Sequence, residues 1–284
     1  MTEVAPPQRT TFAWRRRLAR MAAMLVGLWL VLTVTLWLGQ EWLLFPAPAA
    51  PIGEPFAPQV RVQAVQVPVA PGLALRGWLA RPESAPPDQR MPILLYFGGN
   101  AEEVSGVVGW VGRLSGWSVL AVNYRGYGGN PGSPGEPELM ADALAIHDWV
   151  VHRGDVDPTV VAIAGRSLGS GVALHVAAER PVRAVVLITP YDSIAAVARR
   201  RFPYLPTDLL LRHRFDSLAR AARVTAPALL VLAGRDSVVP PAHGEALAAG
   251  WRGEVEVLSS SDSSHANVLG DPQVWAAMRR LLAK

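Results

Sequence analysis

Val160-Val161-Ala162-Ile163-Ala164-Gly165-Arg166-Ser167-Leu168-Gly169-Ser170-Gly171 is the stretch that decides the fold. It begins as a β-branched apolar run, turns through Gly-Arg-Ser-Leu-Gly and continues into helix-compatible residues, so a strand, a sharp turn and a helix are predicted. A serine on a strained turn needs neighbours without side chains if its hydroxyl is to stand clear, and Gly165 and Gly169 meet that need. The motif predicts a nucleophile at Ser167. The alternative is an ordinary glycine-rich turn, and residues elsewhere in the chain decide between the two.

A serine nucleophile needs a base and an acid that orients the base. After a strand-turn-helix serine, the expected chain order is Ser, then Asp or Glu, then His, with each partner just past a strand. Asp236 follows the apolar run 229–233 after Gly234-Arg235, and His265 follows the run 255–258 and a serine-rich loop. The sequence therefore predicts the triad Ser167, Asp236 and His265.

Other acids and histidines fit these roles less well. Asp192 follows the apolar run 184–188 and is an alternative acid, whereas Asp262 is interpreted as a loop residue. The remaining histidines lie within or next to predicted helices or in an irregular segment, and are interpreted as surface or core residues: His147, His152, His175, His213 and His243.

Stabilising an oxyanion requires two preorganised N–H donors. One is expected from Leu168, the residue after the nucleophile. The other is expected from the loop Phe97-Gly98-Gly99-Asn100-Ala101, where the glycines let the backbone turn inward and Asn100 is the predicted donor. Glu102 and Glu103 are expected to be acids of a helix's first turn.

The chain from residue 60 onward alternates apolar runs with helical stretches. Residues 60–69 and 73–80 predict an antiparallel hairpin with one solvated face. Further strands are predicted at 93–97, 118–122, 160–164, 184–188, 228–233 and 255–258, and helices at 101–114, 136–151, 242–249 and 272–282. This alternation predicts an α/β fold with a mostly parallel central sheet covered by helices on both faces.

Residues 192–223 interrupt the alternation. They contain three consecutive arginines from Arg199 and the sequence Phe-Pro-Tyr-Leu-Pro from Phe202. A short helical insert that covers the strand ends as a lid, and a plain crossover connection with solvated basic residues, are both consistent with this composition.

The basic charge of the chain belongs to its N-terminus. The isoelectric point is about 9.9, but the first twenty residues hold five arginines and one acid, Glu3. Removing those five from 27 basic residues, and Glu3 from 23 acidic ones, leaves 22 of each sign. A nucleic-acid partner is therefore not predicted. The absence of cysteine excludes thiolate nucleophiles, thiolate metal sites and disulfides.

Residues 21–40 carry no charge and, as a helix, would be about 30 Å long, which matches the hydrocarbon core of a bilayer. We predict a basic cytoplasmic tail at 1–20, a transmembrane anchor at 21–44, a Pro/Ala-rich linker at 45–59 and a catalytic domain at 60–284. Because arginines precede the span, the domain is expected on the non-cytoplasmic side of the membrane. A cleaved signal peptide and a buried core helix are the alternatives.

With these motifs in place, residues 60–284 resemble the α/β-hydrolase superfamily. They resemble in particular the branch of serine hydrolases with one N-terminal membrane anchor. The shared features are the anchor, the F-x-G-N-A loop at Phe97, Asn-Tyr-Arg-Gly-Tyr-Gly from Asn123, the Gly165–Gly169 turn, the Phe-Pro-Tyr-Leu-Pro segment and Gly234-Arg235-Asp236. The resemblance implies relatives that are depalmitoylating thioesterases, monoacylglycerol lipases and lysophospholipid lipases. One departure is Gly98-Gly99, where such enzymes often have His-Gly.

The function expected from these features is cleavage of carboxylic ester or thioester bonds through an acyl-enzyme. The expected partners are a small-molecule acyl ester or thioester substrate, with lipids among the candidates, and the lipid bilayer; no cofactor and no metal are expected. A peptidase or a cofactor-free haloperoxidase on the same triad, and a catalytically silent binding protein with this fold, are the alternatives.

Overall fold

The computed structural model describes residues 10–51 and 53–284. It contains an N-terminal helix α1 (Thr10–Leu44) and an α/β unit, and the chain divides into two compact parts between Leu43 and Leu44. The strands are β1 (Val60–Ala70), β2 (Leu73–Pro82), β3 (Met91–Phe97), β4 (Ser118–Val122), β5 (Val156–Arg166), β6 (Ala184–Ile188), β7 (Ala228–Ala233) and β8 (Val255–Ser260). The helices of this unit are η1 (Val104–Arg113), α2 (Glu136–Val151), α3 (Leu168–Glu179), α4 (Ile194–Arg201), α5 (Thr207–Leu210), α6 (Ser217–Ala221), α7 (Pro241–Ala249), η2 (Val268–Gly270) and α8 (Pro272–Ala283).

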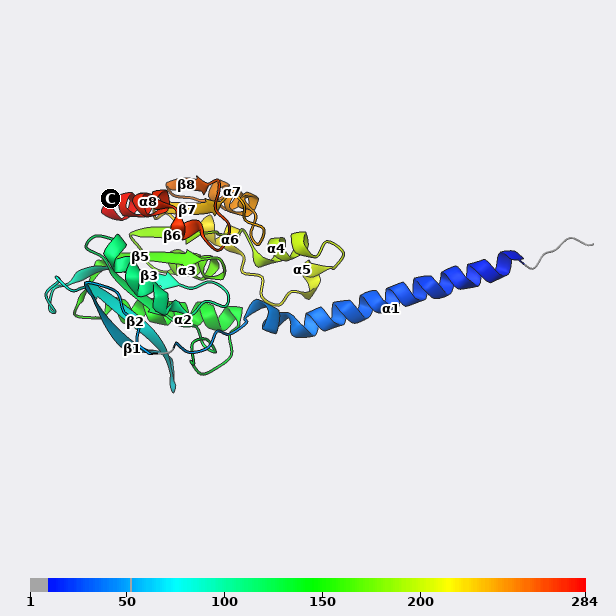
Figure 1. The fold of residues 1–284 in the computed structure, drawn as a ribbon, viewed down its shortest axis with the longest axis horizontal. Coiled ribbons are helices and arrows are strands. Elements are labelled where there is room, and N and C mark those ends of the chain that lie inside the picture. The colour runs from blue at the N-terminus through cyan, green and yellow to red at the C-terminus, as the bar shows by residue number, and fades with distance from the viewer. Residues whose placement is uncertain (1–9, 52) are drawn as a thin grey trace, which may run out of the picture. The chain divides into compact units, whose positions relative to one another are not determined.

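The eight strands form one sheet in the order β1-β2-β4-β3-β5-β6-β7-β8 (Figure 1). β1 pairs antiparallel with β2, β2 pairs antiparallel with β4, and every pair from β4 to β8 is parallel. The chain runs from β3 to its neighbour β4 and then crosses to β5 on the other side of β3. The loops after β3 and β5 therefore diverge at the carboxyl ends of adjacent parallel strands, where α/β sheets bind their ligands.

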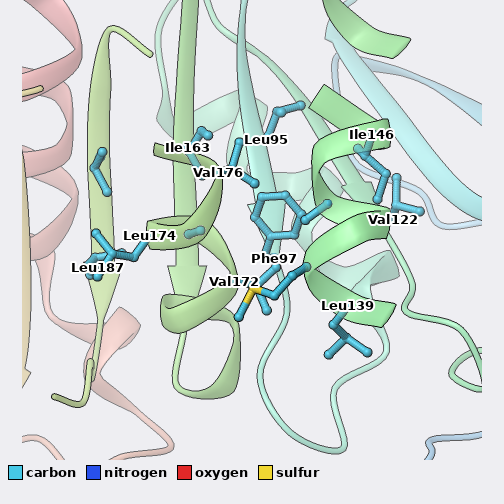
Figure 2. Close-up of a cluster of buried hydrophobic side chains, with 14 of the residues drawn as sticks. Leu95, Phe97, Val122, Leu139, Ile146, Ile163, Val172, Leu174, Val176 and Leu187 are labelled. Carbon is cyan, nitrogen blue, oxygen red and sulfur yellow. The ribbon is translucent and has the colours of Figure 1, made fainter. Parts of the chain in front are cut away.

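Two hydrophobic layers sandwich the sheet, and the alternation of strand side chains sorts residues between them. Leu95, Ile163 and Leu187 point into one layer, where they join α2 and α3. Their chain neighbours Leu94, Ala162 and Val186 face the other layer, which η1 and α8 cover. Figure 2 shows the first layer, with Phe97 of β3 between Leu139 of α2 and Val172 of α3. The predicted α/β fold with a mostly parallel sheet covered on both faces is confirmed.

The structure differs from the sequence-based expectations in detail. The helix predicted at 101–114 is a 3-10 helix that begins only at Val104, since it combines β-branched valines with three glycines, all weak α-helix formers. The region 45–59 is not a free spacer throughout, because the Phe45 side chain is buried and the Gly128 amide donates to the Pro48 carbonyl.

Helix α1 is longer than the predicted anchor. It includes Arg15–Arg20, which were assigned to the tail, while residues 1–9 of that tail, Arg9 among them, lie outside the described residues. Its segment Trp14–Leu44 is long and apolar enough to cross a membrane, and a signal sequence would meet the same two criteria.

Candidate active site

Ser167 lies between the end of β5 and the start of α3, in a backbone conformation that side chains rarely adopt. Its φ is 49° and its ψ is −117°, and a non-glycine residue at positive φ costs free energy that the surrounding structure must supply. The Ser167 amide donates to the Ile188 carbonyl of β6 at 2.9 Å, which ties the turn to the neighbouring strand. The turn therefore presents the serine at the carboxyl edge of the sheet.

The two flanking glycines are required by backbone packing. A Cβ on Gly165 would lie 2.2 Å from the Gly169 carbonyl oxygen, and a Cβ on Gly169 would lie 2.1 Å from the Phe97 carbonyl oxygen of β3. The end of β5, the first turn of α3 and the end of β3 meet here without room for a methyl group. The two glycines therefore also let three backbone segments meet beneath the serine, a requirement that the sequence did not indicate.

The structure brings Ser167, His265 and Asp236 together from three separate loops. His265 Nε2 lies 3.0 Å from Ser167 Oγ, and His265 Nδ1 lies 2.7 Å from Asp236 Oδ2. The Asp236 side chain is 1% exposed, whereas that of His265 is 18% exposed. This is the hydrogen-bonded chain that a serine nucleophile, a base and an orienting acid require.

Backbone amides fix the Asp236 carboxylate. Its Oδ1 accepts hydrogen bonds from the amides of Val238 and Val239, both at 2.8 Å, which leaves Oδ2 for the histidine. A carboxylate held by backbone N–H groups cannot swing away from the imidazole. His265 Nδ1 is thereby kept as the donor and Nε2 as the acceptor that faces Ser167.

In the described part of the loop after β3, the Asn100 amide is left without a protein acceptor while the Gly99 amide before it is engaged. The Gly99 amide donates to Glu102 Oε2 at 2.7 Å, and the Ala101 amide lies near the Tyr127 hydroxyl, whose pKa burial raises and this amide lowers. Within residues 10–51 and 53–284, no protein acceptor is found for the amides of Asn100 and Leu168. Both predicted oxyanion donors line the same pocket as Ser167.

Two tyrosines that were not predicted as site residues hold this loop. The Tyr124 hydroxyl donates to the Gly98 carbonyl at 2.9 Å, and the Tyr127 hydroxyl donates to Asn100 Oδ1 at 3.1 Å. Burial raises the pKa of Tyr127 to about 12 and raises the pKa of Tyr124 well above its usual value, so both stay protonated donors. They belong to the glycine-rich stretch from Asn123, whose sequence suggested a loop but not the residues that the loop contacts.

Glu102 and Arg166 form a second support that the sequence did not indicate. The Glu102 carboxylate accepts from the Tyr96 hydroxyl at 2.7 Å as well as from Gly99, and it pairs with Arg166 at 3.5 Å. Arg166 also donates to the His265 carbonyl at 3.2 Å. Glu102 was expected to be a first-turn helix acid, and instead it links the loop after β3 to the residue before the serine.

A cavity of about 280 Å³ opens beside Ser167 and His265. The loop after β3, together with Glu102 and Arg166, contributes polar groups to its wall. The rest of its wall is mainly apolar and consists of Leu44, Leu168, Tyr191, Ile194, Val197, Val238 and Val239. Such a cavity suits a substrate with a polar reacting group and an apolar chain.

The alternative acid and histidines lie elsewhere. Asp192 pairs with His243 at 2.9 Å, and Asp262 forms an exposed pair with Arg235. His147, His152 and His175 lie in α2, at its end and in α3, and His213 follows α5. No group of three or more potential metal-ligating side chains is present among the residues that the structure describes.

Comparison with known proteins identifies the family. A sequence model described as the alpha/beta hydrolase fold matches residues 92–210. An uncharacterized protein of Mycobacterium tuberculosis is 37% identical over 216 residues, which cover 75% of this chain and 76% of that protein. The chain belongs to the alpha/beta hydrolase family.

One further relative and one solved structure with the same fold carry functional descriptions. Lysophosphatidylserine lipase ABHD12 of Danio rerio is 30% identical over 182 residues, which are 55% of this chain and 46% of that lipase. The acetyl xylan esterase from Paenibacillus sp. R4 shares the fold with a TM-score of 0.66 at 21% identity, covering 82% of this chain and 86% of the esterase. The predicted superfamily and its hydrolase class are confirmed, while the anchored branch within it stays a prediction.

Proposed function

We propose that the chain is a membrane-anchored serine hydrolase that cleaves carboxylic ester or thioester bonds. The observation that carries the proposal is the hydrogen-bonded series from Ser167 Oγ through His265 to Asp236, at 3.0 and 2.7 Å, in the wall of a largely apolar cavity. The esterase and lipase relatives support an ester as the substrate bond.

In the proposed reaction, Ser167 Oγ attacks the acyl carbonyl while His265 Nε2 takes its proton. The tetrahedral intermediate collapses as the bond to the leaving alcohol or thiol breaks, and His265 returns the proton to that leaving group. Water then attacks the acyl-serine with His265 again as base, which releases the carboxylic acid and restores the Ser167 hydroxyl. Asp236 holds the imidazole tautomer and stabilises its positive charge.

The amides of Asn100 and Leu168 are the proposed oxyanion donors. Both lack protein acceptors within the described part of the chain, and both line the cavity beside Ser167. Leu168 also opens α3, so its amide adds the positive end of the helix dipole to the developing negative charge.

An apolar cavity wall and a candidate membrane span in one chain favour a lipidic acyl substrate. A peptidase on the same residues would release an amine instead of an alcohol or thiol. A profile of hydrolysis over p-nitrophenyl esters and acyl thioesters of increasing chain length distinguishes these substrate classes. Hydrolysis of amide substrates alone would contradict the ester assignment.

The catalytic assignment is tested by labelling the full chain in detergent with a fluorophosphonate, which modifies activated serines. We expect Ser167→Ala to abolish labelling and Ser261→Ala to leave it unchanged, because Ser261 is an exposed serine in the loop that carries His265. Circular dichroism must show both variants to be folded. Labelling that survives in Ser167→Ala would overturn the nucleophile, and wild-type protein inert to the probe and to all esters would favour a silent binding protein.

A further inference from the structure

The insert between β6 and β7 exposes large apolar side chains in the turn after α4 and on α5. Helices α4 and α5 protrude as a pair, set apart from the layers that cover the sheet (Figure 1). Between and on them, Phe202 is 40% exposed, Tyr204 is 86% exposed and Leu209 is 87% exposed. A soluble surface rarely concentrates side chains of this size, and such a patch marks a contact with a protein or a membrane.

The same segment is strongly basic. Residues 199–214 contain five arginines and a single acidic residue, Asp208. Asp208 is engaged by Arg199, whose guanidinium lies 2.9 Å from it, so that pair joins the end of α4 to α5. Arg200 and Arg201 are exposed beside the patch, and the guanidinium of Arg201 lies 5.9 Å from the centre of the Phe202 ring. The arrangement therefore favours a partner that is apolar and negatively charged at once.

The chain enters the catalytic unit at this insert. Phe45, the residue that follows α1, is buried, with its ring 5.1 Å from that of His213 and 6.3 Å from that of Phe215, at the end of the insert. Leu44 lines the cavity together with Ile194 and Val197 of α4. The first residues of the catalytic unit thus pack on the insert that carries the exposed patch.

We propose that α4, α5 and the turn between them form an interfacial docking surface that rests on the anionic phospholipids of the anchoring bilayer. This inference rests on the proposed membrane anchor. Apolar side chains that enter the headgroup boundary, flanked by arginines that meet lipid phosphates, are the chemistry by which peripheral segments bind such membranes. An acidic protein partner would explain the arginines, but it would not require the patch to lie beside the chain's entry from a span.

Docking places the wall of the cavity at the membrane surface. Ile194 and Val197 of α4 line the cavity next to Ser167, and α4 continues directly into Arg199–Arg201. A lipid acyl chain that leaves the bilayer at this insert would therefore reach the nucleophile without crossing water.

The absence of cysteine makes a direct test simple. The full chain carrying Leu209→Cys is labelled with the environment-sensitive fluorophore NBD in nanodiscs of phosphatidylcholine, with or without phosphatidylglycerol. The matched control is Ser84→Cys, an exposed position in the loop between β2 and β3. We expect a blue shift at 209 and quenching by nitroxide-labelled lipid in discs that contain phosphatidylglycerol, and neither change at 84.

Charge reversal tests the arginines. Arg200→Glu with Arg201→Glu should reduce the quenching at 209, whereas Arg252→Glu, an exposed arginine between α7 and β8, should not. Quenching at 209 no greater than at 84 would overturn the docking surface. Quenching that is equal in both lipids and insensitive to the arginines would overturn anionic lipid as its partner.

Fluorophosphonate labelling of the same discs keeps the two proposals separate. Labelling of Ser167 without quenching at 209 contradicts docking and supports the hydrolase. Quenching at 209 without labelling of Ser167 supports docking and contradicts the hydrolase. A full chain that does not co-purify with the discs overturns the anchor and the docking surface together.

Discussion

At the scale of single residues, Asp236 with His265 and Asp192 with His243 are both aspartate–histidine pairs, and only the first pair reaches the serine. Asp236 contacts His265, which contacts Ser167, whereas Asp192 contacts His243. His243 Nε2 has no hydrogen-bond partner among the described residues. The second pair connects the start of the insert to α7 and does not contact Ser167.

Substitution of the two acids separates these roles. We expect Asp236→Asn to lower kcat/KM for a p-nitrophenyl ester by about 10⁴-fold, because an amide in this position favours the wrong imidazole tautomer. Asp192→Asn should keep activity within a few-fold of the wild type and lower the thermal unfolding midpoint. The opposite result, with activity lost only in Asp192→Asn, would transfer the acid to that residue.

Glu102 is the residue that most clearly holds the loop after β3 in place. It accepts from Gly99 and Tyr96 and pairs with Arg166, so its removal frees the Gly99 amide next to Asn100. We expect Glu102→Ala to lower kcat by about 10- to 100-fold with little change in KM, as for a group that positions an oxyanion donor.

Its neighbour supplies the control for that measurement. Glu103 begins η1 by accepting from the Ser105 amide at 2.9 Å and also accepts from Asn123. Glu103→Gln should therefore lower stability without the selective loss of kcat. Equal losses of kcat in Glu102→Ala and Glu103→Gln would mean that kcat falls with any loss of stability around the loop after β3, and not because the contacts of Glu102 are lost.

The sequence indicated the residues of the candidate site that obey a motif or an order along the chain, and missed those defined by contacts between distant segments. Ser167, Asp236 and His265 follow strands in a fixed order, so their positions along the chain were sufficient to predict them as a triad. Glu102 and Arg166 are 64 positions apart, and nothing local to either one indicates the other. The tyrosines of the loop after β4 were visible as a motif, but their hydrogen-bond acceptors were not.

At the scale of elements, the turn that carries Ser167 depends on contact between three backbone segments, the end of β3, the end of β5 and the first turn of α3. A Cβ on Gly169 would lie 2.1 Å from the Phe97 carbonyl oxygen and 2.4 Å from that of Gly98, both in the backbone and unable to rotate away. We expect Gly169→Ala to lower the free energy of unfolding by about 1–3 kcal/mol or more and to slow fluorophosphonate labelling. Gly112→Ala in η1, where an added Cβ meets nothing within 4 Å, is the matched control. Comparable unfolding midpoints for the two variants would contradict the packing argument.

Helices α2 and α3 are joined at the surface by a charged pair. Arg180, just after α3, contacts Asp148 of α2 through two hydrogen bonds of 2.7 and 2.8 Å. The hydrogen bond from Arg180 is the main reason that the pKa of Asp148 falls to about 2, and His147 adds to the effect against the opposing effect of burial. The carboxylate is 46% exposed, so solvent screening keeps the contribution of the pair to stability modest.

The sign of the pH dependence follows from that lowered pKa. A carboxylate whose folded pKa lies below its unfolded value of about 3.9 stabilises the fold fully above that value and loses its contribution as the pH falls toward about 2. The stability difference between wild type and Asp148→Asn should therefore shrink from pH 5 to pH 2. Denaturant unfolding in detergent at pH 5, 3 and 2 measures it, with Asp88→Asn, in an exposed loop, as control. A difference that is constant over this range would show that Arg180 does not bind the ionised form preferentially.

At the scale of the whole molecule, the sheet was predictable because its central strands β3, β4, β6 and β7 are buried on both faces. Continuous apolar runs that alternate with helices have one common solution, a parallel sheet between helical layers. The composition of residues 45–59 resembled that of a linker, yet Phe45 is buried against residues more than 160 positions away. Composition describes what a segment can do in isolation and contains no information about the surface onto which it packs.

The orientation of the chain in a membrane is the remaining prediction at this scale. Four arginines, Arg15 to Arg17 and Arg20, lie at the N-terminal end of α1, and a single charge, Glu41, lies near its other end. Positive-inside logic then keeps residue 1 in the cytoplasm and exports the catalytic unit. In a bacterial host, a C-terminal alkaline phosphatase fusion should be active and a C-terminal green fluorescent protein fusion dark.

Reversing Arg15, Arg16 and Arg17 to glutamate supplies the control, because it removes the charge bias and leaves the apolar segment unchanged. We expect this variant to lose alkaline phosphatase activity and to gain fluorescence. The size of the exported fusion separates an anchor from a signal peptide, since cleavage would remove about 4–5 kDa, the mass of an apolar segment that spans the bilayer with its flanks. A fluorescent wild-type fusion would place the active site in the cytoplasm, and any acyl lipid delivered through the insert would then come from the inner leaflet. An exported, uncleaved fusion would instead assign Ser167 to lipids of the outer leaflet, the side on which arginines of α4 would meet their phosphates.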